Sequence, residues 1–464
     1  MFNKIRVKFN WFIKTKILYQ EMSTKTIRIG LCQLNSRDDK EENFRIGQKL
    51  INEAKEQNAK IVFFPEAFDY ICDSKLATIE KAEPIDGPLI NGYRKLAKDN
   101  QLWISLGGFH EQTKDKSRIL NSHLMINDQG DIVGHYSKIH LFDVQAGSLN
   151  IRESDYTQSG SIILNPIETP FGRIALGICY DLRFVEFARL LTSSATKGAQ
   201  ILTYPSAFTK HTGEAHWEIL LRARAIENQC FVIAAAQVGS HSSKRESYGH
   251  SMVVDPWGNI LLDMGLEYPS IRTIDIDLER IKVIRDKMPI IEHRRLDLYS
   301  LISTKNMILP INNKDDEKIS WGQLQITAGQ IFFRSALSMA LVNRKPVIPG
   351  HVLVSPIRCV ERFSDLNSEE IHDLFLSTQL IAKKIEEFFQ AKSLSIAIQD
   401  GEYAGQTVKH VHVHILPRKA GDFEDNDTIY HELAHHDKKE KGWREEQEMI
   451  NEAKVFRKLF YPDQ

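Results

Sequence analysis

Cysteine, net charge and long apolar runs are all scarce in this chain. Its 464 residues include only five scattered cysteines, and so small and odd a number argues against a disulfide framework and for a reducing compartment. A formal net charge of -1 provides no overall field toward nucleic acid or a membrane surface. No apolar run approaches the roughly 20 residues that a membrane-spanning helix needs. We therefore expect a cytoplasmic globular protein with no nucleic-acid partner and no membrane partner.

The N-terminus departs from this balanced composition. Residues 1–22 form a basic N-terminal extension in which the first acid is Glu21. Mitochondrial targeting segments are basic, amphipathic and poor in acids, but they favour arginine and serine, whereas this extension is rich in lysine. Two interpretations stay open: a mitochondrial form of the protein, or a second translation start at Met22. In either case we exclude the extension from the fold.

The length exceeds what one hydrophobic core usually covers, so two domains are expected. Residues 23–302 alternate short apolar strands with helices, as is typical of a layered α/β domain. A polar, charged stretch at 303–318 has the composition of a linker, and residues 319–464 form a smaller α+β unit. In the first domain the predicted strands are 27–31, 61–64, 102–106, 174–178, 201–204 and 231–235, and the predicted helices are 40–59, 88–100, 184–196 and 216–229. In the second domain the predicted strands are 331–342, 351–355, 394–399 and 409–416, and the predicted helices are 368–390 and 443–459.

A candidate catalytic centre in the first domain is built around Cys179, which follows an apolar strand and precedes a helix. The N–H groups at the start of a helix favour a thiolate at such a position. A thiolate needs a base and an electrostatic partner, and Glu66 and Lys138 both stand at the ends of apolar strands. Taken singly, Cys179 reads as a buried structural residue and Glu66 as a surface ion-pair residue. Together they favour a catalytic site, because charged residues at apolar strand ends are unusual unless they are paired.

The first domain resembles the nitrilase superfamily over nearly all of residues 25–300. The resemblance is carried by Phe64-Pro65-Glu66, Tyr136-x-Lys138-x-His140-Leu141-Phe142, Gly177-x-Cys179-Tyr180-Asp181-x-Arg183-Phe184, Tyr204-Pro205-Ser206-Ala207-Phe208, Leu221-x-Ala223-Arg224-Ala225-Ile226-Glu227-Asn228 and Gly249-x-Ser251-x-Val253-x-Asp255-Pro256-x-Gly258. It implies an αββα sandwich, with Cys179 as nucleophile, Glu66 as general base and Lys138 as the stabiliser of the oxyanion. A second glutamate of the family falls at Glu153. One departure is Val185, which stands where relatives usually carry proline.

The resemblance implies hydrolysis of a carbon–nitrogen amide bond through a cysteine thioester. Glu66 protonates the leaving amine and then activates the water that deacylates the enzyme. No cofactor is needed for this half. The fine pattern is similar to the Nit branch, whose members act on deaminated glutathione, so we expect that substrate, although residue patterns alone do not identify the amide.

The second domain contains three alternate histidines, His410, His412 and His414. On a strand they share one face, while Val411 and Val413 face the core. Such a cluster suits zinc as well as nucleophilic catalysis, and the spacing leaves both open. Glycines and amides at 399–407 suit phosphate, and no additional Cys or acidic ligand accompanies the three histidines. The surroundings therefore favour phosphate chemistry with no metal held by the protein.

This half resembles the histidine-triad hydrolases of the Fhit branch over about residues 320–464. The resemblance is carried by Ala340-Leu341-Val342-Asn343-Arg344-Lys345-Pro346-Val347, Gly350-His351-Val352-Leu353-Val354 and the run from Ala404 to Phe423. It implies that His412 attacks the α-phosphorus of diadenosine triphosphate, so that a nucleotidyl-histidine forms and AMP and ADP are released. The residues implied in substrate binding are Asn343, His351, Gln399, Gln406, His410 and His414. A divalent cation, Mg²⁺ or Mn²⁺, would be bound with the nucleotide.

Two aromatic positions in this half bear on the resemblance. Trp321 stands where the family has phenylalanine, which keeps an aromatic side chain at that place. Tyr430 matches a tyrosine that is a phosphorylation site in relatives, and a plain surface aromatic is an equally good interpretation.

Together the halves resemble the invertebrate Nit–Fhit fusion proteins, which implies a homotetramer with the Nit part at its centre. Two other classes of function stay open. One is a metal-binding module at the three histidines, and the other is a signalling scaffold whose nucleotide complex is the output.

Overall fold

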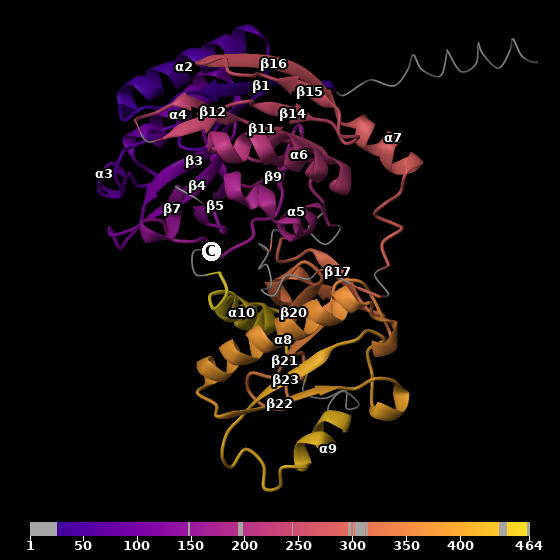
Figure 1. Cartoon of the computed structure of the whole chain (residues 1–464). Coiled ribbons are helices and arrows are strands. Elements are labelled where there is room, and N and C mark those ends of the chain that lie inside the picture. Colours follow the sequence, from indigo (N-terminus) through magenta and orange to yellow (C-terminus); the bar gives the residue numbers. More distant parts are fainter. Residues whose placement is uncertain are drawn as a thin grey trace, which may run out of the picture. The chain divides into compact units, whose positions relative to one another are not determined.

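The computed structural model describes residues 26–146, 149–193, 198–243, 245–295, 298–299, 301, 311, 314–435 and 443–461. The predicted extension 1–22 lies outside the described residues, as do residues 303–310, 312 and 313 of the predicted linker. The chain divides into two compact units with the boundary between Arg294 and Arg295, and each unit has its own sheets and cores (Figure 1).

The first unit is built on two large sheets. One has the order β13-β12-β1-β2-β3-β4-β5, with β16 antiparallel to β1, and the other has the order β15-β14-β11-β10-β9-β8. The strands of the first sheet are β13 Glu246–Tyr248, β12 Ala236–Ser240, β1 Thr26–Leu34, β2 Ile61–Phe64, β3 Trp103–Gln112, β4 Ile119–Ile126, β5 Ile132–Ser137 and β16 Ser270–Asp277. Those of the second are β15 Ile260–Asp263, β14 Met252–Val254, β11 Phe231–Ala234, β10 Ile201–Thr203, β9 Gly172–Leu176 and β8 Ile167–Thr169. A separate hairpin joins β6 Asp143–Ala146 to β7 Leu149–Arg152.

Helices cover the outer faces of both sheets, as Figure 1 shows. The helices of this unit are α2 Lys40–Glu56, α3 Lys75–Glu80, α4 Pro88–Asn100, α5 Val185–Thr192, α6 Lys210–Asn228 and α7 Glu279–Lys287. Strand β2 explains the layering, because successive side chains of a strand point to opposite faces. Ile61 and Phe63 join the core that also contains strands β9 and β10, whereas Val62 and Phe64 join the core under α2 and α4. The αββα sandwich predicted from the sequence is confirmed.

The second unit has a five-stranded antiparallel sheet in the order β19-β20-β21-β23-β22. Its strands are β19 Ile331–Arg334, β20 Ser338–Val342, β21 Val352–Pro356, β22 Ser393–Ile398 and β23 Val413–Arg418, and a hairpin of β17 Lys318–Trp321 and β18 Leu324–Thr327 precedes them. The helices are α8 Ser368–Phe389, α9 Thr428–His435 and α10 Glu446–Arg457. Helices α8 and α10 pack on one face of the sheet, where their apolar side chains join one core with those of β20, β21 and β23. The predicted α+β class is therefore confirmed.

Two strand predictions in this unit are wrong. The predicted strand 331–342 is two strands, because Ser335 closes a turn: its N–H donates to the Ser338 carbonyl at 2.9 Å and its hydroxyl accepts from the Ser338 N–H at 2.9 Å. The predicted strand 409–416 begins only at Val413. Of the helices that the structure describes, none has the length and apolar character to cross a membrane.

Two candidate active sites

The polar centre of the first unit gathers at the ends of strands from both sheets. Glu66 lies two residues after β2, Lys138 directly after β5, Glu153 directly after β7 and Cys179 three residues after β9. All four residues are buried, and all four line one cavity of about 450 Å³. The structure therefore brings together the four residues that the sequence analysis selected from distant parts of the chain.

Lys138 lies between two carboxylates. Its Nζ donates to Glu66 Oε1 at 3.0 Å and to Glu153 Oε1 and Oε2 at 3.1 and 2.9 Å. Burial by itself lowers the pKa of Lys138, but the charges of Glu153 and Glu66 raise it well above its ordinary value. Burial by itself raises the pKa of Glu66, yet the charge of Lys138 and the hydrogen bond from Cys179 lower it below its ordinary value. Lys138 is thus a cation and Glu66 an anion, although both side chains are buried.

Cys179 begins a short 3-10 turn, Cys179–Arg183, with a φ of 45°. Its N–H donates to the Pro205 carbonyl at 2.9 Å. This hydrogen bond holds the backbone in its strained positive-φ conformation. Burial, together with the negative charge of Glu66, raises the pKa of Cys179. The expectation that the start of a helix keeps Cys179 as a thiolate is therefore wrong. A single short turn does not offset burial beside a carboxylate, and the resting group is a thiol that donates to Glu66.

Two partners of Glu66 are functional positions that the sequence analysis missed. Asn121 of β4 donates from Nδ2 to Glu66 Oε1 at 2.9 Å and to Glu153 Oε1 at 3.2 Å. The Ala207 N–H donates to Glu66 Oε2 at 2.9 Å. Asn121 is followed by Ser122 and His123 in its strand, so no local pattern singles it out. Both donors stabilise the negative charge and orient the carboxylate that faces Cys179.

Glycine is required beneath Glu66. Gly108 has a φ of 65°, and a Cβ there would lie 2.5 Å from Cγ of Glu66 and 2.7 Å from its Cα. The Ala67 N–H donates to the Gly108 carbonyl at 3.0 Å, so the two segments are in direct contact. Any side chain at position 108 would push Glu66 away from Lys138 and Cys179.

The turn after Cys179 is held by the fully buried Asp181. Its carboxylate accepts from the Tyr136 hydroxyl at 2.8 Å and from the Ile178 N–H at 2.9 Å, and it contacts Nδ1 of His140 at 2.7 Å. The His140 ring stacks on Phe184, with 3.6 Å between the ring centres. The sequence motifs around Lys138 and Cys179 therefore form one interlocked structure rather than two independent signals.

We predict that Asn121→Ala lowers kcat for amide hydrolysis by about 10- to 100-fold, because the hydrogen bond that orients Glu66 is lost and one bond to a carboxylate is worth about 1.5–3 kcal/mol. Steady-state kinetics on a small amide measure the effect. Asn100→Ala is the control, since the Asn100 side chain only donates to the Leu96 carbonyl in α4. Unchanged kcat in the Asn121 variant would contradict a role for this amide in orienting Glu66.

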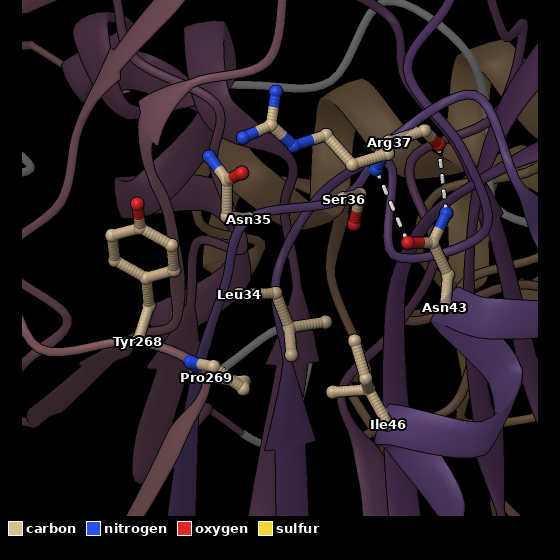
Figure 2. A pocket seen from close by; sticks show the side chains of 8 residues that line it. All are labelled: Leu34, Asn35, Ser36, Arg37, Asn43, Ile46, Tyr268 and Pro269. Carbon is tan, nitrogen blue, oxygen red and sulfur yellow. Dashed lines mark hydrogen bonds between the residues drawn. The ribbon is translucent and has the colours of Figure 1, made fainter.

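A second cavity in this unit lacks catalytic groups. It has a volume of about 260 Å³ and is lined by Leu34, Asn35, Ser36, Arg37, Asn43, Ile46, Tyr268 and Pro269. Figure 2 shows that Asn43 is paired with the backbone of Arg37 there, through bonds of 2.8 and 3.1 Å. This lining contains no cysteine, histidine or acid, so the chemistry of the unit belongs to the cavity around Cys179.

The candidate site of the second unit centres on His412. Its Nδ1 lies 2.7 Å from the carbonyl oxygen of His410. A carbonyl only accepts, so Nδ1 carries the proton and Nε2 carries the lone pair. The indole of Trp321 packs on this ring with 5.3 Å between the ring centres, and its Nε1 donates to Ser355 at 3.1 Å. The neutral tautomer that a nucleophilic histidine needs is set by the backbone.

His414 belongs to a chain of hydrogen bonds. The Val347 N–H donates to Nδ1 of His351 at 3.1 Å, so Nε2 of His351 carries the proton and donates to Nδ1 of His414 at 2.9 Å. Asn343 contacts Nε2 of His351 at 3.2 Å and is buried with it. The structure thus gathers Asn343, His351, His412 and His414 in one polar cluster.

The expectation of three histidines along one strand is wrong, because β23 begins at Val413 and both His412 and His410 precede it. The backbone around His410 makes its own hydrogen bonds. Its N–H donates to the Val408 carbonyl at 2.7 Å, and the Val411 N–H donates to Val360 at 2.7 Å, outside the β21–β23 ladder. Its Nε2 lies 2.9 Å from the Pro356 carbonyl, and its Nδ1 accepts from the Val360 N–H at 3.1 Å. Burial lowers the pKa of His410. With both ring nitrogens on backbone groups, His410 is poorly suited to share a metal ion with His412 and His414.

Gln399 and Gln406 lie in the loop after β22. Gln399 Nε2 donates to the Ala404 carbonyl at 3.2 Å, and Gln406 Nε2 donates to the Glu361 carbonyl at 2.8 Å. The Gly401 N–H donates to Gln406 Oε1 at 2.7 Å. These bonds join both amides to backbone groups, and none of them joins an amide to the histidine cluster.

Tyr430 lies on α9 and is 57 % exposed.

Comparison with known proteins assigns a family to each of the two units. Residues 28–286 match the family described as carbon-nitrogen hydrolase, and residues 325–421 match the HIT domain. These matches define a carbon-nitrogen hydrolase unit followed by a histidine-triad unit.

The whole chain also matches single proteins. It is 43% identical over 448 residues to the nitrilase and fragile histidine triad fusion protein NitFhit of Caenorhabditis elegans, with 96% of this chain and 99% of that protein covered. The crystal structure of the C. elegans NitFhit protein superposes with a TM-score of 0.81 at 40% identity and covers 94% of this chain and 100% of that one. Over 275 residues the chain is 46% identical to the human deaminated glutathione amidase, which covers 58% of this chain and 83% of that protein. The chain belongs to the NitFhit fusion family and is a hydrolase with a Nit amidase domain and a histidine-triad domain.

Proposed function

We propose that the first unit hydrolyses the amide of deaminated glutathione through a thioester on Cys179. The buried contact of Cys179, Glu66 and Lys138 carries this proposal. Glu66 accepts the thiol proton as the sulfur attacks the carbonyl carbon, and the cationic Lys138 stabilises the oxyanion. Glu66 then returns the proton to the amine, the carbon–nitrogen bond breaks and the thioester remains. A water that gives its proton to Glu66 attacks the thioester, the acid leaves, and the proton returns to sulfur.

The choice of substrate has two supports. Relatives that are about 46–48% identical over 275 residues are named deaminated glutathione amidase. Deaminated glutathione carries a carboxylate at each end, and besides Lys138 the cavity lining includes four basic residues, Lys75, Arg152, Arg183 and Arg245. Lys75 and Arg152 pair with Asp155 at the rim. Arg183 lies over the rings of Tyr180 and Phe208. Product analysis of purified protein with deaminated glutathione tests the proposal.

For the second unit we propose cleavage of diadenosine triphosphate. The lone pair on Nε2 of His412 attacks the α-phosphorus, the phosphoanhydride bond breaks, ADP leaves and a nucleotidyl-histidine remains. Water then releases AMP. Because Nδ1 of His414 accepts the hydrogen bond from His351, His414 carries its proton on Nε2. This N–H can donate to the phosphate oxygens of the substrate. A divalent cation, Mg²⁺ or Mn²⁺, would neutralise the substrate phosphates and bind with the nucleotide. Release of AMP and ADP from diadenosine triphosphate is the test.

We also propose that the first unit assembles a homotetramer. Large apolar side chains are exposed on α5, on α6 and in the turn before β15: Val185, Ile219, Ile226 and Trp257 are 42 %, 69 %, 43 % and 50 % exposed. Helices α5 and α6 contact each other, and Ile226 lies beside Gly258 of that turn, so these side chains stand on neighbouring elements. Exposed apolar side chains gathered in this way support a subunit interface. We expect the whole chain to behave as a tetramer in light scattering.

Ile219→Asp combined with Trp257→Asp is expected to give smaller assemblies, because charges in an apolar interface are costly. Leu76→Asp is the control, since Leu76 is equally exposed, at 66 %, but lies on α3. An unchanged mass in the double variant would contradict the assignment of this surface.

A further inference from the structure

His110, at the end of β3, lines the same cavity as Cys179 and Glu66. No step of the proposed amidase mechanism uses it. Its side chain is 13% exposed and belongs to a buried pair with Asp69, whose side chain is fully buried. A histidine on a cavity wall with one ring nitrogen bonded to a buried carboxylate has its other ring nitrogen available for a ligand.

Asp69 fixes which nitrogen faces the cavity. The His110 backbone N–H donates to Asp69 Oδ2 at 2.9 Å, and Nδ1 of the same residue lies 2.8 Å from Oδ1. The Tyr70 N–H also donates to Oδ1, at 2.9 Å. A carboxylate that accepts these bonds keeps the proton of His110 on Nδ1. The other nitrogen, Nε2, has no hydrogen-bond partner among the described residues and is the atom left to face the cavity.

The ring is also held by stacking. His110 lies on the ring of Tyr70 with 4.4 Å between the ring centres and 27° between the planes. The Tyr70 hydroxyl in turn donates to the Thr78 carbonyl at 2.7 Å. Two contacts thus fix the direction of Nε2 before any substrate enters, which is the arrangement expected of a group that orients a ligand.

We propose that His110 is a specificity-determining residue of the amidase site, with Nε2 hydrogen-bonded to the part of the substrate that leaves as the amine. This inference rests on the proposed function. Glu66 must reach the leaving nitrogen in order to protonate it. Glu66, Ala67 and His110 line the same cavity, and the hydrogen bond from the Ala67 N–H to the Gly108 carbonyl holds their two segments together. In deaminated glutathione the leaving part is cysteinylglycine, whose peptide and thiol groups offer hydrogen-bond partners to an imidazole.

His110→Asn is the central variant, because its amide nitrogen can keep the bond to Asp69 while Nε2 is removed. Its kcat/KM for deaminated glutathione is expected to fall by about 10- to 100-fold, mainly through KM, as for the loss of one substrate hydrogen bond. For 2-oxoglutaramate, which has the same acyl part but releases ammonia, kcat/KM is expected to stay within about twofold of wild type. His110→Gln places a polar atom near Nε2 and is expected to restore part of the loss. His110→Phe keeps the ring on Tyr70 without a nitrogen and is expected to repeat the selective loss.

The chain offers a matched control in His250. Its Nδ1 lies 3.0 Å from Asp263 and its ring stacks on Tyr248 with 4.6 Å between the ring centres, but it does not line the cavity. His250→Asn should leave both substrates unaffected. Equal losses on both substrates in the His110 variants, or no loss on either, would overturn the inference. A wild-type protein that hydrolyses 2-oxoglutaramate but not deaminated glutathione would overturn the proposed substrate, and the inference with it.

Discussion

Replacement of Cys179 by alanine is expected to abolish amide hydrolysis and to leave cleavage of diadenosine triphosphate near the wild-type rate. The thiol is the only atom in the site that can form the thioester, so the loss should be at least about 10⁴-fold, as for other catalytic nucleophiles. The second activity is expected to survive because every residue of the histidine cluster follows the boundary at Arg294–Arg295. Both activities are measured on the same purified variant, by release of the amine and by release of AMP.

Two companion variants sharpen this test. Glu66→Gln keeps the shape of the side chain and the bond from Ala207 but removes the base, so it is expected to lose amide hydrolysis as completely as Cys179→Ala. Cys230→Ala is the control, because Cys230 is a buried thiol of the same unit that does not line the cavity. Mass spectrometry should find an acyl group on Cys179 during turnover in the wild type. Amide turnover retained by the Cys179 variant would refute the covalent mechanism.

Replacement of His412 by asparagine is expected to cut the release of AMP by about 10⁴-fold or more. Asparagine can keep the hydrogen bond to the His410 carbonyl through its amide nitrogen, but it has no atom that can attack phosphorus. Binding of diadenosine triphosphate is expected to survive, since Asn343, His351 and His414 are unchanged. Product release is followed by chromatography, and binding by calorimetry in the presence of Mg²⁺.

The outer histidines separate nucleophilic catalysis from metal binding. His410→Asn and His414→Asn are expected to lower the rate less than His412→Asn, because they hold the loop and the phosphate oxygens and do not attack. A covalent nucleotide should be trapped on His412 in the wild type and be absent from the His412 variant. If all three variants lose the same activity and each also releases stoichiometric zinc, then the triad is a metal site and the nucleotidyl-histidine mechanism is wrong.

Local pattern was enough to predict most of the elements and to select Cys179, Glu66 and Lys138, whereas Glu153 follows from the resemblance to the nitrilase superfamily. Strand β2 and helix α4 have the bounds that the sequence predicts. The strand is a run of four apolar residues and the helix is an amphipathic segment that begins with proline, and both patterns are local to the segment itself. Glu66, Lys138 and Cys179 were selected from short motifs. They meet because the motifs stand at strand ends, which sheet topology brings together.

The partners of these residues were decided by tertiary structure. Asn121 and Ala207 contact Glu66 across 55 and 141 residues of sequence, and Asp69 meets His110 across 41. No local sequence pattern predicts a contact between residues so far apart in the chain. The same is true of Gln399 and Gln406, whose amides donate to the carbonyls of Leu433 in α9 and of Glu361, which they meet only after folding.

The protonation states of Cys179 and His412 show most clearly which properties the sequence determines and which depend on the tertiary structure. The sequence by itself determined two domains and their nucleophile candidates, since composition, strand alternation and short motifs are local properties of the chain, and the resemblance of those motifs to known families implied two hydrolases. Only the tertiary structure decided that Cys179 rests as a thiol and that His412 carries its proton on Nδ1. The pKa of Cys179 is raised because burial and Glu66 act on it together, and the tautomer of His412 follows from a turn that ends before β23 begins. A protonation state depends on burial and on the charges and hydrogen bonds of the groups close by in space, and those groups come together only in the folded protein.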